Sequence, residues 1–216
     1  MELKVILLII FGVVSVIYLI TLGYKPAVFQ YILKGLLIPL LLAIYLSSVN
    51  IIFWPVVLAL VFAWIGDVLL VKITNILWFR LGLASFLIGH ICYIAAMHGF
   101  INPFNVTILV VSIIAAGGLG IFIYKVVKPG KQMKIPVIAY ETVILVMVIF
   151  ALQLFLSQFI AHGLIFSLLI LSGSICFVVS DTLLALRTFR KVKIYFAVMI
   201  TYIAAQFLIT LGFCMV

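Results

Sequence analysis

The chain has 216 residues, of which 69% are hydrophobic and 8% are charged, and its mean hydropathy is +1.57. Ordinary globular domains are about half apolar and a quarter charged, so this composition excludes a soluble domain. The formal net charge of +9 by itself would suit a nucleic-acid-binding protein. The basic residues, however, lie mainly in short stretches between long apolar runs. The chain is therefore expected to be an integral membrane protein without a nucleic-acid partner.

Eight apolar runs follow one another along the chain, each long enough to cross a membrane as a helix. They cover roughly residues 4–22, 27–47, 51–71, 81–99, 105–125, 135–156, 162–186 and 194–216. The runs are continuously apolar rather than alternating, which disfavours a membrane β-barrel. The first run lacks a strongly basic start and a small-residue cleavage site, so it is expected to be retained. The predicted fold is an all-α bundle of eight transmembrane helices in one domain, residues 1–216.

The basic residues predict the orientation of this bundle. If the loops are assigned alternately to two sides, one side receives Lys4 alone. The other receives Lys25, Lys72, Arg80, Lys125, Lys128, Lys131, Lys134, Arg187, Arg190, Lys191 and Lys193. Cytoplasmic loops are enriched in Lys and Arg, so we expect the basic side to be cytoplasmic and both termini to be extracytoplasmic. The expected location is the cytoplasmic membrane of a bacterium, where the basic loops also favour anionic lipid headgroups.

Two aspartates, Asp67 and Asp181, lie inside apolar runs and share a local pattern. The first stands in Gly66-Asp67-Val68-Leu69-Leu70 and the second in Ser180-Asp181-Thr182-Leu183-Leu184. A carboxylate at the centre of a membrane helix costs roughly 2.5–3.5 kcal/mol on insertion scales, and such residues usually face a polar interior and have a function. The pair is therefore the first candidate for a functional site.

The repeated pattern also suggests an internal duplication. Four predicted spans fall in each of the halves 1–104 and 105–216, so both halves would have the same orientation, as in a parallel repeat. The alternative is that short apolar motifs resemble each other by chance.

Further polar residues are predicted to lie at similar depth. With a rise of 1.5 Å per residue, Asp67 lies about 7 Å inward from Lys72, and Asp181 about 9 Å from Arg187. The same arithmetic places Lys34, His90, Glu141 and Tyr202 about 10–15 Å from the basic residues at their own helix ends. The sequence therefore predicts a polar pocket open to the cytoplasmic side, in which two acids in unequal surroundings differ in protonation.

Each of these residues also has a purely structural interpretation. Lys34 would neutralise an aspartate as a buried ion pair, His90 would hydrogen-bond across helices, and Glu141 would face the membrane interface. Gly173 and Ser174 are interpreted as close-packing residues. Cys92, Cys176 and Cys214 lack metal-ligand or redox spacing and are expected to be small packing residues.

Five motifs in order resemble the YhhN-like family of membrane proteins, which includes the lysoplasmalogenases. They are Gly66-Asp67-Val68-Leu69-Leu70; Phe86-x-x-Gly89-His90-x-x-Tyr93; Pro136-Val137-x-Ala139-Tyr140 with Met147; Gly173-x-x-x-Phe177-x-x-Ser180-Asp181-x-Leu183-Leu184-Ala185 with Phe189; and Tyr202-x-x-x-Gln206-x-Leu208-Ile209. Two features depart from the family pattern. Lys34 precedes Gly35, with the proline of this span only at Pro39, and Glu141 is not part of the pattern.

The resemblance implies an eight-span enzyme that hydrolyses the vinyl ether bond of lysoplasmalogens to a fatty aldehyde and a glycerophospho-headgroup. Its catalytic aspartates map onto Asp67 and Asp181, one as general acid and the other as an ionised carboxylate. The implied partners are the lysophospholipid substrate and membrane lipids, and no metal or cofactor is implied. The candidate substrate-binding residues are Lys34, His90, Tyr93, Tyr140, Glu141, Tyr202 and Gln206.

Two other functions remain open at this point. A proton-coupled small-molecule or lipid transporter would also use paired intramembrane acids and parallel repeats. It requires access from both sides, whereas the polar residues are predicted in the cytoplasmic half. A zinc hydrolase using Asp67, His90 and Asp181 lacks helical ligand spacing. The sequence does not define the oligomeric state.

Overall fold

The structure is a computed structural model that describes residues 3–22, 27–72 and 75–216. All regular elements in these ranges are helical. The long helices are α1 (Leu3–Thr21), α2 (Ala27–Ser48), α3 (Trp54–Leu69), α4 (Ile76–His98), α5 (Val106–Val127), α6 (Lys134–Ser157), α8 (Leu164–Arg190) and α9 (Tyr195–Phe213). A short helix, α7 (Phe159–His162), and two 3₁₀ turns, η1 (Leu70–Lys72) and η2 (Lys131–Met133), complete the set. Lys25 and the side chain of Lys72 lie outside what the structure describes.

Seven of these helices are long and apolar enough to cross a membrane, which makes the chain a multi-pass integral membrane protein. The remaining long helix, α3, is apolar but has 16 residues, or about 24 Å, against a hydrocarbon core of about 30 Å. The 3₁₀ turn η1 continues it by about 6 Å. That α3 is an eighth span therefore stays a prediction.

Several predicted boundaries were wrong, and capping explains two of them. α4 begins at Ile76 rather than at residue 81, because the Asn75 side chain accepts hydrogen bonds from the amides of Leu77 and Trp78. α8 runs to Arg190 instead of residue 186, and ends where Lys191 takes the left-handed conformation (φ 56°). Arg187 and Arg190 therefore lie on a helix, not in a loop.

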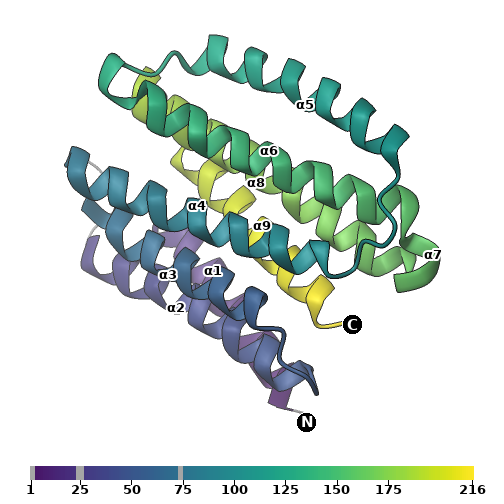
Figure 1. The fold of residues 1–216 in the computed structure, drawn as a ribbon. Helices are drawn as coiled ribbons and strands as arrows, with labels where there is room; N and C mark the ends of the chain where they lie inside the picture. The colour runs from purple at the N-terminus through teal and green to yellow at the C-terminus, as the bar shows by residue number, and fades with distance from the viewer. Residues whose placement is uncertain (1–2, 23–26, 73–74) are drawn as a thin grey trace.

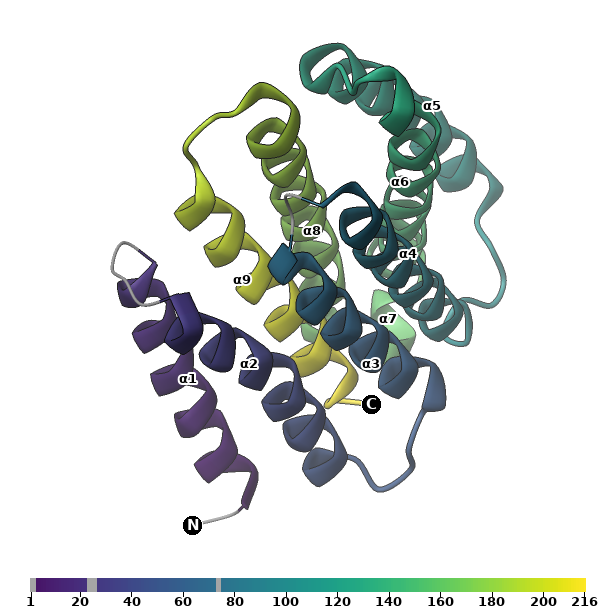
Figure 2. The same cartoon turned by 90° about the vertical axis from the view of Figure 1, so that its left-hand side faces the viewer.

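The helices form a bundle in which α1 and α5 lie at opposite edges (Figure 2). The most extensive contacts join α3 to α4 and α8 to α9, and α6 packs on both α4 and α8. α2 contacts α3 and α9. The α1–α2–α3–α4 half thus meets the α5–α6–α8–α9 half through α4–α6 and α2–α9, which suits the expected duplication of residues 1–104 and 105–216. The duplication itself stays a prediction.

Glycines set the close approach of the two main helix pairs. A Cβ on Gly89 would lie 3.2 Å from the Ala59 carbonyl oxygen, and one on Gly173 would lie 3.0 Å from that of Ala205. Small residues are the usual means by which membrane helices pack closely. The packing interpretation of Gly173 agrees with this, and Ser174 donates its hydroxyl to the Ile170 carbonyl within α8.

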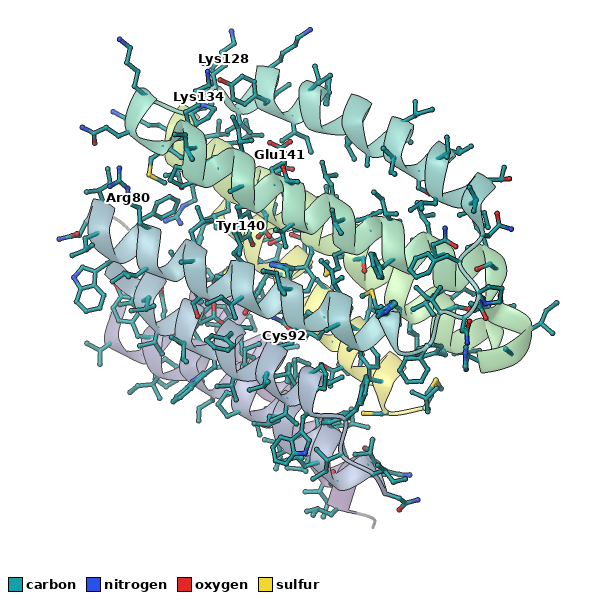
Figure 3. The ribbon with its side chains drawn as sticks, in the orientation of Figure 1. Arg80, Cys92, Lys128, Lys134, Tyr140 and Glu141 are labelled. Carbon is teal, nitrogen blue, oxygen red and sulfur yellow. The ribbon has the colours of Figure 1, made fainter. Side chains whose placement is uncertain are left out.

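The basic residues gather at one end of the bundle, where Figure 3 shows Arg80, Lys128 and Lys134. Arg80 at the start of α4 donates to the Gln132 carbonyl in the α5–α6 connection at 2.8 Å, so these two basic segments lie together. The start of α1 and the C-terminus lie toward the opposite end (Figure 1). This arrangement fits the predicted topology, but which end is cytoplasmic stays a prediction.

Candidate active site

Asp67 and Asp181 line the same small cavity, of about 50 Å³, between α2, α3, α4, α8 and α9. This volume exceeds the roughly 10–15 Å³ needed for one water molecule, so the cavity has room for a few waters but not for a lipid. The polar groups around it come from helices far apart in the sequence. Its polar lining residues are Lys34, Asp67, Ser180, Asp181, Arg187, Tyr195 and Tyr202.

Asp67 lies in the last turn of α3 and is 2% exposed. Its Oδ1 is 3.0 Å from the Lys34 Nζ of α2, and its Oδ2 accepts a hydrogen bond from the Tyr202 hydroxyl of α9 at 2.7 Å. An ion pair this deeply buried is held as a unit, because removing either partner leaves an uncompensated charge. The structural interpretation of Lys34 is thus the one that the geometry favours.

Asp181 lies in the middle of α8 and is partly exposed. Its Oδ2 accepts a hydrogen bond from the Tyr140 hydroxyl of α6 at 2.6 Å. Among the described side chains, no cationic group lies within ion-pair distance of Asp181. Asp181 also lines two further small cavities, one toward α5 and one toward α4. Asp181 is therefore the more accessible carboxyl, and its described partner is neutral.

The Tyr202 ring is held by two aromatic neighbours. It meets Phe86 edge-to-face at 5.8 Å and Phe177 at 6.1 Å. Phe86 can take this place because residue 66 is glycine: a Cβ there would lie 2.6 Å from the Phe86 ring. The glycine before Asp67 thus orients a hydrogen-bond donor to Asp67.

His90 lies beside the aspartate cluster but contacts neither carboxylate. Its ring packs edge-to-face on Tyr140 at 5.5 Å and on Phe177 at 4.9 Å. The Phe86 carbonyl one turn earlier is close, but neither ring nitrogen makes a hydrogen bond of ordinary geometry. The expected interhelical hydrogen bond of His90 is therefore absent from the described structure.

A family model for the YhhN family matches residues 29–213. The chain belongs to the YhhN family. The matched range contains both aspartates, Lys34 and every residue that contacts them, so the suspected resemblance is confirmed. No curated protein and no solved structure matches the chain at a significant level.

Two predicted site residues of this YhhN-family protein lie away from the aspartates. The Tyr93 hydroxyl donates to Gln206 Oε1 at 2.8 Å, and both side chains are 1% exposed. Gln206 Nε2 and the nearby Thr210 hydroxyl have no partner. Tyr93 stacks on Phe213 rather than lining the aspartate cavity. The Tyr93–Gln206 pair therefore joins α4 to α9 as an interhelical hydrogen bond.

Glu141 does not line the cavity that the two aspartates share. It follows Tyr140 on α6, and Figure 3 shows the two side chains on opposite sides of the helix, Glu141 toward α5. Its Oε1 is buried without a partner. Glu141 lines a groove between α5 and α6 that Lys125 and Lys134 also line. That it faces the membrane interface stays a prediction.

Sequence reasoning missed Tyr195 and gave Arg187 only a minor place. Arg187 lies 4.2 Å above the Tyr195 ring, a cation–π contact, and the Tyr195 hydroxyl is 3.1 Å from that of Tyr18 on α1. Both Arg187 and Tyr195 line the aspartate cavity. Tyr195 lies on α9, beyond the end of α8, so the sequence did not connect it with Asp181.

The described His, Cys, Asp and Glu side chains do not gather into a metal site. Within residues 3–22, 27–72 and 75–216, no three His, Cys, Asp or Glu side chains come close enough to hold a metal ion. His90, the imidazole of the zinc alternative, faces Tyr140 and Phe177. The hydrogen-bond donors around the aspartates are one lysine, one arginine, the Ser180 hydroxyl and tyrosine phenols.

Proposed function

We propose that this YhhN-family protein is a lysoplasmalogenase-like hydrolase that cleaves the vinyl ether bond of lysoplasmalogens by carboxyl acid/base catalysis. The observation that carries the proposal is the pair of carboxyls lining one water-sized cavity in unlike surroundings. Asp67 is paired with Lys34, whereas the described partner of Asp181 is the neutral Tyr140. The cytoplasmic membrane of a bacterium, with eight spans and the site toward the cytoplasm, is the setting that we propose for it.

The unlike surroundings suggest unlike roles. A carboxyl without a cationic partner in an apolar site is favoured in its neutral form, so Asp181 is assigned as the general acid. Asp67 beside Lys34 is favoured as the carboxylate. This division is the one that carboxyl pairs adopt in glycoside hydrolysis, which also proceeds through an oxocarbenium ion.

The proposed hydrolysis begins with protonation of the vinyl ether. Asp181 transfers its proton to the β-carbon of the vinyl ether, and the C=C electron pair forms the new C–H bond. The oxocarbenium ion is stabilised by the Asp67 carboxylate, and a water adds to its carbon while Asp67 accepts the proton of that water. The hemiacetal collapses to the aldehyde and the glycerol hydroxyl. Proton return from Asp67 to Asp181 crosses their shared cavity.

The remaining cavity residues suit binding roles. Lys34 holds Asp67 in place, and the Tyr202 and Tyr140 hydroxyls orient the two carboxyls. Arg187 has a guanidinium that suits a phosphate headgroup. His90, packed edge-to-face against Tyr140, supports the position of that phenol.

The test is to incubate purified protein with a lysoplasmalogen and, separately, with its ester-linked lysophospholipid analogue. The proposal expects aldehyde from the first and no fatty acid from the second. A Val68→Ala variant, altered next to Asp67 on the half-exposed side of α3, should behave like wild type. If no aldehyde forms and lipid-vesicle assays instead show proton-coupled flux, the transporter alternative replaces the enzyme.

A further inference from the structure

A groove of about 650 Å³ runs between α5 and α6, outside the aspartate cavity. Its walls are mainly apolar, and its polar lining residues are Tyr124, Lys125, Lys134, Glu141 and Thr142. Figure 3 shows Lys134 at the basic end of the bundle and Glu141 deeper, between the two helices. The volume lies within the 300–1,000 Å³ typical of small-molecule sites.

The groove exists because α5 stands away from the rest of the bundle. The main packing partners of α5 are α6 and α8. Only 11% of the most apolar 18-residue stretch of α5 is buried inside the protein. Gly117 lines the groove, and a Cβ there would have no atom within 4 Å. In a membrane, an apolar groove on this face is open to lipid chains.

A groove that only contacted lipid chains would not need a carboxyl group, yet Glu141 lines this one. Its Oε1 is buried and unpartnered and lies 3.7 Å from the position of a Cβ on Gly120. A buried acceptor left without a hydrogen bond loses the solvation that it had in water without compensation. The side chain therefore favours a ligand that brings a donor into the groove at this depth.

A cation lies nearer the basic end: Lys134 is about two turns, or about 10 Å, before Glu141 on α6, and its side chain extends toward α5. The Lys134 ammonium is 6.0 Å from the centre of the Tyr124 ring, and Tyr124 is one turn, or about 6 Å, beyond Gly120 on α5. The groove thus offers a cation, then a hydrogen-bond acceptor, then apolar wall. A lysophospholipid has the matching order: a phosphate, a free glycerol hydroxyl a few bonds away, and a single chain.

We propose that the α5–α6 groove binds a lysophospholipid, with its phosphate at Lys134 and Lys125 and its free glycerol hydroxyl donating to Glu141. A diacyl lipid carries an ester in place of that hydroxyl, so it leaves Glu141 unpartnered and brings a second chain. The carboxyl of Glu141 therefore selects single-chain lipids.

The same side chain connects the groove to the aspartates. Glu141 and Asp181 both line a second, smaller cavity of about 40 Å³, between α5, α6 and α8. Glu141 thus stands between the groove and Asp181, and the groove is a lateral entry for substrate from the membrane. The role of the groove as a substrate entry rests on the proposed function. The binding of a lysophospholipid in the groove does not depend on that function.

The experiment uses the full chain in nanodiscs of diacyl phosphatidylcholine and an ester-linked lysophosphatidylethanolamine with a diazirine in its chain. The proposed hydrolysis does not consume this probe. After irradiation, labelled peptides should come from the facing sides of α5 and α6, and unlabelled lysophosphatidylethanolamine should compete where diacyl phosphatidylethanolamine does not. Equal labelling of the outer faces of α1 and α5, without competition by unlabelled lysophosphatidylethanolamine, would mean that the probe contacts the protein only as surrounding lipid. That result would overturn the proposal.

Two matched glycines on α5 sharpen the test. Gly117→Phe fills the groove without meeting protein atoms and should lower labelling about tenfold. Gly118→Phe, also in open space but outside the groove lining, should leave labelling unchanged. Equal effects of the two variants would contradict a specific site.

Glu141→Leu tests the hydroxyl contact itself. Loss of one buried hydrogen bond should reduce the preference for lyso over diacyl competitor about fivefold. A full preference in this variant would overturn the assigned contact. Groove labelling in a protein that releases no aldehyde would refute the vinyl ether reaction alone, and aldehyde release without groove labelling would refute the groove alone.

Discussion

Asp67 and Asp181 stand in nearly the same local sequence but in different structures. α3 ends two residues after Asp67, at Leu69, whereas α8 continues for nine residues after Asp181 to Arg190. Asp67 is buried against Lys34 and Tyr202, while Asp181 is partly exposed, bonds to Tyr140 and lines three cavities. The neighbours contributed by other helices, not the local motif, differentiate the two carboxyls.

Because of this difference, Asp67 contributes to the stability of the fold as well as to the proposed chemistry. Asp67 closes an ion pair that ties α2 to α3, so it contributes both to folding and to catalysis. Asp181 carries no such pair, so its proposed contribution is chemical. The following substitutions separate these two contributions.

The largest expected effect is the loss of turnover in Asp181→Asn and Asp67→Asn. General acid–base groups contribute roughly 10²–10⁴-fold, so each variant should lose at least about a hundredfold in kcat for aldehyde release. Retention of full activity in either variant would remove that aspartate from the mechanism.

Stability should distinguish the same two variants. Asp67→Asn leaves the Lys34 ammonium buried without its anion and should lower the free energy of unfolding by about 3–5 kcal/mol. Asp181→Asn should change it by less than about 1 kcal/mol, because no ion pair is broken. Thermal unfolding in one detergent measures both, and equal losses would contradict the structural distinction.

A double substitution isolates the ion pair. Asp67→Asn combined with Lys34→Met removes both charges and should recover most of the stability lost in Asp67→Asn, as replacement of buried pairs by apolar residues does. Aldehyde release should stay absent. Recovery of activity together with stability would show that Asp67 acts only through folding.

The two phenols should matter less than the carboxyls. Tyr140→Phe and Tyr202→Phe each remove one hydrogen bond to an aspartate, worth about 1 kcal/mol, so a rate loss of roughly fivefold is expected for each. The kcat of both variants, measured beside Tyr31→Phe as a control at an exposed position outside the cavities, checks this. A loss as large as that of the aspartate variants would make a phenol the proton donor.

The smallest effect is expected from Gly66→Ala, which acts on Asp67 through Phe86 and Tyr202. The added Cβ would lie 2.6 Å from the Phe86 ring, which must shift, so stability should fall by about 1–3 kcal/mol and turnover by a few fold. Gly12→Ala, where a Cβ meets nothing within 4 Å, is the matched control. Equal stability and equal turnover of the Gly66→Ala and Gly12→Ala variants would exclude positioning of Asp67 through Phe86 and Tyr202.

Sequence patterns predicted the helical membrane fold, the family and the proximity of Asp67, Asp181, Lys34 and Tyr202 because apolar length and helical rise determine depth. Depth alone does not determine direction around a helix axis. For that reason Glu141 was grouped with the aspartates although it points toward α5, and Tyr93 and Gln206 were grouped with them although they bond to each other. Arg187 and Tyr195 could not be paired from sequence, since their contact depends on how α9 folds back on α8.

The most direct test of the central claim is aldehyde release from a lysoplasmalogen in D₂O by wild type and Asp181→Asn, followed by mass spectrometry. Proton transfer from Asp181 to the β-carbon predicts aldehyde with one deuterium on the carbon next to the carbonyl from wild type, and none formed by the variant. A short incubation with unlabelled aldehyde controls for exchange. Unlabelled aldehyde from wild type, or labelled aldehyde at the same rate from Asp181→Asn, would contradict the account.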